Sequence, residues 1–122
     1  MEGVFSDASS FNQDLNDWHV SKVNNMSEMF KQTTNFNGDI SNWDVSKVND
    51  MSHMFYGTTS FKGDVSNWNV NQITMMDSVF AFTNSFTDNL NAWDVSNVET
   101  CRVCSKAQKK LMDMHQTGTF RV

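Results

Sequence analysis

Hydrophobic residues recur along the chain at intervals of 25 residues, with polar residues between them. Phenylalanine fills one slot of this repeat and tryptophan fills another, in the series Phe11, Phe36, Phe61, Phe86 and Trp18, Trp43, Trp68, Trp93. A fixed period of this size is typical of stacked repeats, because each unit buries its apolar face only against its neighbours. The pattern therefore predicts a stack of about four coils around a continuous hydrophobic column.

Two local periods follow one another inside each coil. Trp18 and Val20 alternate with polar residues, which predicts a short strand near Asp17 to Ser21 whose copies stack into a parallel sheet. After the strand the apolar spacing lengthens to three and four residues, which predicts a short helix or a pair of 3₁₀ turns. This second segment holds Val23, Met26, Met29 and Phe30.

The register also divides the chain into three parts. Residues 1–10 match the back half of a coil, so we expect them to be a partial coil that is truncated or covered by a partner. Residues 11–105 hold the repeats, and residues 106–122 are predicted to form a C-terminal cap. A run without helix breakers from Glu99 to about His115 predicts a capping helix.

Two phrases of the repeat resemble a known family. They are Phe36-Asn37-Gly38-Asp39-Ile40-Ser41-Asn42-Trp43-Asp44-Val45-Ser46-Lys47-Val48 and Met51-Ser52-His53-Met54-Phe55. They are similar to the BspA-type leucine-rich repeats of bacterial surface proteins and mycoplasma-type lipoproteins. This resemblance implies an α/β fold: a right-handed leucine-rich-repeat-like solenoid with a short-stranded parallel sheet, short helical turns and a C-terminal capping helix. It also implies a role in adhesion or protein–protein contact, in a protein that is secreted or displayed at the cell surface and has no catalytic residues.

Composition excludes several classes of function. The net charge of −5 argues against a nucleic-acid partner, which needs clustered Lys and Arg. No apolar run approaches the roughly 20 residues that cross a bilayer, so we expect no direct membrane insertion. No Ser/His/Asp or Cys/His set is brought together by the repeat, so we expect neither catalysis nor a cofactor.

Two sets of residues suggest metal or redox chemistry. Asp14, Asp39 and Asp64 form a column, and stacked carboxylates repel unless a cation lies between them or each accepts backbone N–H groups in its own turn. We favour the turn role over calcium. Cys101 and Cys104 occupy slots that hold methionine in earlier coils, which favours core packing over zinc binding or redox chemistry.

Candidate contact residues lie on the predicted outer surface. His19, Asp44, Asn69 and Asp94 alternate with inward residues, so they should face outward, with Asn71 and Gln72 beside them. Such an array either binds a peptide, glycan or protein, or keeps the surface soluble. Tyr56 and Phe82 fall outside the repeated hydrophobic slots, which predicts a partner-binding patch.

These observations favour a non-enzymatic module that contacts a partner protein or a neighbouring subunit, as an adhesion domain or a scaffold subunit. An array that binds calcium, a glycan or ice is the alternative. A carbohydrate-active enzyme is the least favoured interpretation.

Overall fold

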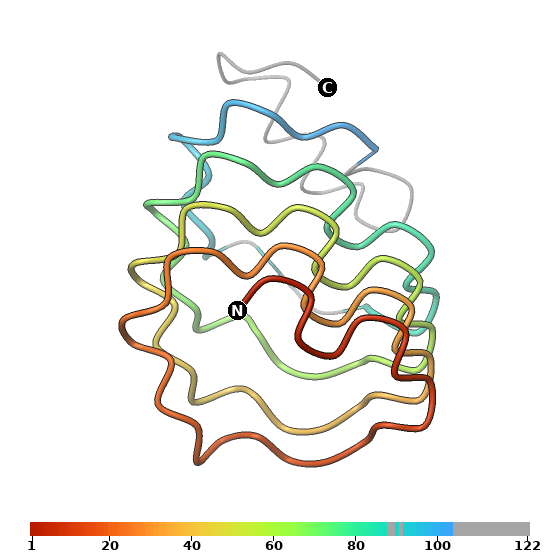
Figure 1. Ribbon diagram of the computed structural model, residues 1–122. Coiled ribbons are helices and arrows are strands. Elements are labelled where there is room, and N and C mark those ends of the chain that lie inside the picture. Colours follow the sequence, from red (N-terminus) through yellow and green to blue (C-terminus); the bar gives the residue numbers. More distant parts are fainter. Residues whose placement is uncertain (88–89, 91, 104–122) are drawn as a thin grey trace.

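The computed structural model describes residues 1–87, 90 and 92–103, which form a stack of similar coils. Figure 1 shows successive turns of the chain one above another, from the red and orange turns low in the picture to the blue turn near the top. Isolated parallel bridges join Asn25 to Asp50, Asp50 to Met75, and Met75 to Thr100. Each bridge spans 25 residues, so one coil corresponds to one sequence repeat.

The predicted α/β class is wrong. The described residues contain no helix, and their only β-structure is the isolated bridges, so there is no leucine-rich-repeat-like sheet. Asp17 to Ser21, predicted to be a strand, consists of turn and irregular residues, and Val23 to Phe30 holds an isolated bridge at Asn25 and a turn at residues 27–30 instead of a helix. Residues 99–103, where the predicted capping helix begins, are not helical, and its remainder with the cap at 106–122 lies outside the described residues.

Backbone hydrogen bonding explains why neither regular element forms. The N–H groups of Glu28 and Phe30 donate to carbonyls of the next coil, 24 residues on, at 2.9 Å each. The N–H groups of Met29 and Lys31 donate to carbonyls three residues earlier in the same coil. A helix needs successive N–H groups to bond within the segment, and a strand needs an extended backbone. Because successive N–H groups alternate between carbonyls of the next coil and carbonyls of the same coil, this segment forms neither a helix nor a strand.

Left-handed backbone conformations mark the places where each coil turns. The residues with positive φ form two columns at the repeat spacing: Gly3, Glu28, His53, Ser78, Val103 and Asp7, Gln32, Gly57, Phe82. Most side chains avoid this conformation, so its recurrence in every described coil shows that the stack fixes the backbone geometry against local preference.

The core is a set of ring columns that run along the stack. Equivalent rings lie parallel, with centroids 5.9 Å apart for Phe36 and Phe61 and 6.3 Å apart for Trp43 and Trp68. These four side chains are at most 4% exposed. Each buried aromatic side chain contributes on the order of 2–3 kcal/mol. The columns are therefore the main source of stability.

Buried hydrogen bonds tie the same columns together. The indole N–H of Trp43 donates to the carbonyl of Leu15 at 2.8 Å, and Trp68 repeats this bond one coil later. The fully buried hydroxyl of Thr58 donates to the carbonyl of Phe30 at 2.6 Å. Because a buried polar group costs free energy when unpaired, these bonds fix the vertical register of the coils.

Trp18 departs from its column. Its side chain is 41% exposed, whereas Trp93 at the other end of the series is 2% exposed. Residues 1–10 occupy the register of residues 26–35, so no described residue lies in the slot below Trp18. Its nearest ring is that of Phe5, tilted at 5.5 Å. The predicted continuous hydrophobic column is therefore wrong at this position, because Trp18 is not buried.

Candidate binding groove

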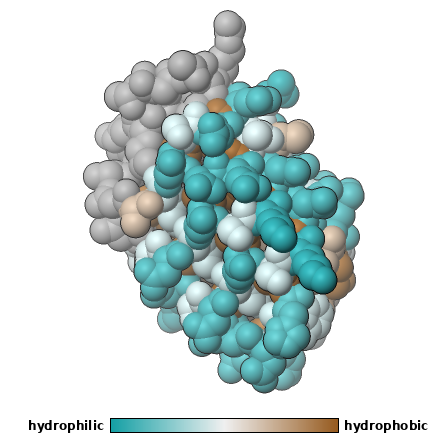
Figure 2. Space-filling view, turned by 90° about the vertical axis from the view of Figure 1, so that its left-hand side faces the viewer, coloured by the Kyte–Doolittle hydropathy of each residue, from teal (hydrophilic) through white to brown (hydrophobic). Residues whose placement is uncertain are grey.

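The polar residues predicted to face outward are on the surface. His19, Asp44, Asn69, Asn71, Gln72 and Asp94 are all exposed. Figure 2 shows one face of the molecule as mostly hydrophilic, with hydrophobic residues visible between polar ones. None of these six residues lines the groove described below.

Several of these side chains stabilise their own turns. The Asp44 carboxylate accepts hydrogen bonds from the Ser46 hydroxyl at 2.6 Å and the Ser46 N–H at 3.0 Å. These bonds favour the charged form and hold the pKa of Asp44 below its ordinary value. Asp94 makes the same pair of bonds with Ser96, which lowers its pKa in the same way. These carboxylates therefore shape the backbone at the surface.

The aspartates weighed as calcium ligands also bond within the stack. Asp14 accepts the N–H of Asp39 at 2.9 Å, while the Asp39 and Asp64 carboxylates each accept from the serine two residues on. Within the described ranges, no group of three or more His, Cys, Asp or Glu residues lies close enough to hold a metal ion. Cys101 is fully buried in the hydrophobic core, and Cys104 lies outside the described residues.

A groove on another part of the surface contains the off-register aromatic pair. Its volume is about 530 Å³, and it is lined by Asp7, Ser9, Gln32, Thr34, Tyr56, Gly57 and Phe82. The rings of Tyr56 and Phe82 meet edge to face, with centroids 5.3 Å apart and planes at 74°. His53 adds a tilted ring contact to Tyr56 at 5.8 Å. The structure thus brings together the two aromatic residues predicted as a partner patch.

Phe82 occupies a left-handed backbone position and is also exposed. Its φ is +58°, and its side chain is 56% exposed, the largest exposed fraction among the exposed large hydrophobic residues of the described chain. A left-handed conformation costs an ordinary residue about 1–2 kcal/mol. The equivalent positions in the other coils hold Asp7, Gln32 and Gly57, so the fold itself does not require an aromatic residue here.

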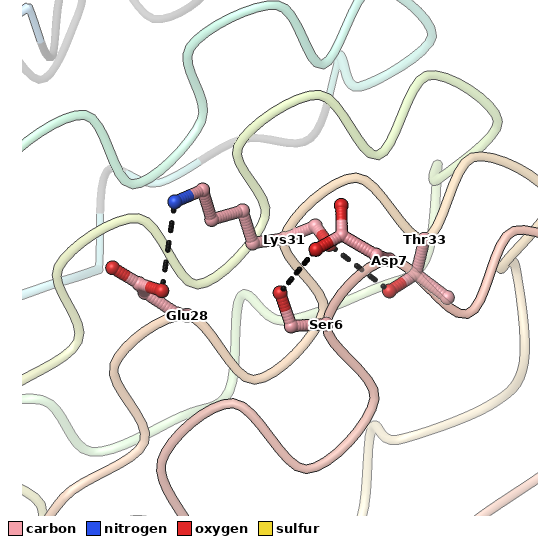
Figure 3. Close-up of polar contacts among 5 residues, drawn as sticks. All are labelled: Ser6, Asp7, Glu28, Lys31 and Thr33. Carbon is pink, nitrogen blue, oxygen red and sulfur yellow. Dashed lines mark hydrogen bonds and ion pairs between the residues drawn. The ribbon is translucent and has the colours of Figure 1, made fainter.

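The other end of the groove is acidic. The hydroxyl of Ser6 donates to the Asp7 carboxylate at 3.3 Å. Lys31 is in the adjacent coil, but its ammonium pairs with Glu28 at 3.5 Å. Figure 3 shows the ammonium of Lys31 directed at Glu28, while the Asp7 carboxylate faces Ser6. No ion pair to Asp7 is present among the described residues, so its negative charge is available to a ligand.

The uncharged, non-aromatic lining residues of the groove, which we call its floor, are Ser9, Gln32, Thr34 and Gly57. Gly57 has a φ of +69°, and a Cβ at this position would lie 3.3 Å from Cγ of Gln32. Glycine therefore permits the turn and avoids this close contact with Gln32.

Sequence reasoning missed the polar residues of the groove. Asp7, Gln32 and Gly57 precede Phe82 at 25-residue intervals, and the same spacing joins Ser9 to Thr34. The glycine at position 57 was the available signal for a left-handed column. Alignment of the repeats on that column would have grouped Phe82 with these residues.

The described residues contain no helix long and apolar enough to cross a membrane. Comparison with known proteins gives one family: residues 1–117 match the model described as "Mycoplasma protein of unknown function, DUF285". No curated protein and no solved structure matches the chain.

Proposed function

The chain belongs to the DUF285 family of mycoplasma proteins of unknown function, and we propose that it is a non-enzymatic module that binds a partner protein through the groove between Asp7 and Phe82. The resemblance of its repeat to BspA-type surface proteins supports the same class of function. In this proposal the stack is a rigid support, and specificity comes from the positions that differ between coils.

Phe82 is the observation that carries this proposal. Phe82 is an aromatic residue in a left-handed conformation with more than half of its surface exposed, so its backbone strain offsets most of what its partial burial contributes to stability. Single exposed apolar residues are common on protein surfaces, whereas contiguous apolar patches rimmed by polar groups mark binding sites. Phe82 meets this description, since it lies beside Tyr56 in a groove with otherwise polar walls.

The dimensions and chemistry of the groove suit a segment of extended polypeptide. Its volume falls within the range of about 300–1,000 Å³ that is usual for ligand sites, and it is shallow and open to solvent. The aromatic pair offers an apolar anchor for one side chain. The amide of Gln32 can both donate to and accept from a peptide backbone. The hydroxyl of Thr34 donates to the Ser9 carbonyl at 3.5 Å and can accept from a peptide N–H.

The test is selection of a random heptapeptide library on immobilised protein. We expect wild-type protein to enrich related peptides that compete for a single site. The double variant Tyr56→Ser, Phe82→Ser should lose at least tenfold in affinity for them. The matched control is Met75→Ser, which removes an apolar residue that is 42% exposed and lies outside the groove.

Two results would contradict the proposal. One is a selection that enriches no peptide above background. The other is a set of selected peptides that bind the double variant as tightly as wild type, or that lose as much affinity with Met75→Ser. Circular dichroism and urea denaturation of each variant separate loss of binding from loss of folding.

A further inference from the structure

The two ends of the groove differ in chemistry, and this difference predicts the sequence of the partner. Resting on the proposed function, we infer that the groove binds an extended segment in which an apolar residue and a Lys or Arg lie about four positions apart. The apolar residue contacts Tyr56 and Phe82, and the basic residue pairs with Asp7. The neutral stretch between them contacts the floor of the groove.

The spacing follows from the repeat. Asp7 and Phe82 occupy equivalent positions three coils apart, as their 75-residue separation and shared left-handed conformation show. Neighbouring backbones joined by hydrogen bonds lie about 4.8 Å apart, so three steps cover about 14 Å. An extended chain advances about 3.3 Å per residue, and about four residues therefore connect the two ends.

The preference for a basic residue follows from unbalanced charge. Asp7 is exposed, and the hydroxyl of Ser6 is its one side-chain partner within the described ranges. The ammonium of Lys31, which belongs to the next coil, is held by Glu28. A guanidinium or ammonium from the partner would complete the site with a charge-assisted hydrogen bond. The net charge of −5 also favours the approach of a basic segment over an acidic one.

The middle of the groove favours small or polar residues in the partner. Gly57 has no side chain, and neither Gly57 nor Gln32 carries a charge that could pair with a charged side chain. Backbone hydrogen bonds to Gln32 and Thr34 would fix the direction of the segment without selecting its side chains. Specificity then lies at the two ends.

The probes are pools of capped peptides with defined anchors and degenerate residues elsewhere. One pool places Leu and Lys four positions apart, a second replaces Lys with Glu, and a third places Lys two positions from Leu. Binding is followed by ¹H–¹⁵N chemical shifts. We expect the first pool to bind about tenfold more tightly than either other pool and to shift the amides of Gln32 and Gly57.

Variants assign the charge preference to one residue. Asp7→Asn should abolish the difference between the Lys and Glu pools while binding through the Leu anchor persists. Asp17→Asn removes an exposed carboxylate outside the groove and should leave the difference unchanged.

The outcomes separate this inference from the proposed function. If all three pools bind equally at the groove, the inference is wrong and the binding module stands. If no pool binds and the library selection also fails, both are wrong. A soluble oligosaccharide that shifts Gln32 and Gly57 while the peptides do not would overturn the assignment of a protein partner.

Discussion

Phe82→Asn is a direct test of whether Phe82 serves folding or binding. Asparagine tolerates the left-handed conformation, so the substitution relieves up to about 1–2 kcal/mol of backbone strain. The substitution also removes the edge contact with Tyr56, which stabilises the fold by roughly 0.5 kcal/mol at an exposed site. The burial lost is less than half of what full burial of a phenylalanine contributes, or about 1 kcal/mol, because the ring is 56% exposed. The opposing effects nearly cancel.

We therefore expect the free energy of unfolding of Phe82→Asn to lie within about 1 kcal/mol of wild type in urea denaturation. Phe80 is the matched comparison, since it is two residues away, fully buried, and stacked on Phe55 at 5.5 Å and on Phe86 at 4.3 Å. Phe80→Ala should cost about 3–5 kcal/mol. A loss above about 2 kcal/mol for Phe82→Asn would refute the reasoning, because it would give Phe82 a structural role that accounts for its presence.

Three further predictions concern the stack itself. Trp68→Ala should lower the free energy of unfolding by about 3–5 kcal/mol, because the indole is 4% exposed and hydrogen-bonded. Trp18→Ala should lower it by less than about 2 kcal/mol, because Trp18 is 41% exposed. Equal losses in urea denaturation would show that the two side chains are equally buried. Thr58→Val removes the buried hydroxyl that donates to the Phe30 carbonyl of the previous coil, and because this carbonyl also accepts the N–H of Thr33, the cost should be about 0.5–1.5 kcal/mol, seen as a lower Tm. An unchanged Tm would mean that the bond contributes nothing. The pKa of Asp44 is depressed below 3.8 mainly by the Ser46 side chain, so its stabilising effect is present above that pH and is lost as pH falls through the folded-state pKa. Ser46→Ala should therefore weaken the fall of Tm below about pH 4, and an unaltered pH profile would contradict this cause.

The register of the columns could be predicted from the sequence, whereas the backbone conformation could not. Trp43 and Val45 are buried and Asp44 is exposed, as simple alternation predicts. That alternation does not require a strand, because the N–H of Trp43 bonds to Ile40 within the same coil. A period in side-chain burial says which residues face the core and leaves the backbone hydrogen-bond partners undetermined.

The left-handed positions were the main feature hidden from sequence reasoning. Glu28, Gln32 and Val103 are ordinary residues in the left-handed conformation, and their identities give no sign of it. The glycines at positions 3 and 57 are the clearest signs of these columns, and Asp7 and His53 are weaker ones. Because the turn positions were unknown, the spacing of Met26, Met29 and Phe30 was interpreted as helical, although all three are buried by the stacking of turns.

The aromatic end of the candidate groove could be predicted from the sequence, whereas its acidic end could not. Tyr56 and Phe82 stand out because they are aromatic and outside the repeated slots. The acidic end at Asp7 was not identified, because its role depends on which residues Lys31 and Ser6 contact. Those contacts depend on the three-dimensional arrangement of neighbouring coils.

The measurement that tests the central claim most directly is the dissociation constant of one library-selected peptide for wild type and for Phe82→Asn, taken where urea denaturation shows both to be folded. The groove account predicts at least a tenfold weaker complex for the variant at nearly equal stability. Equal dissociation constants would contradict it, because the exposed ring at Phe82 would then have no part in binding.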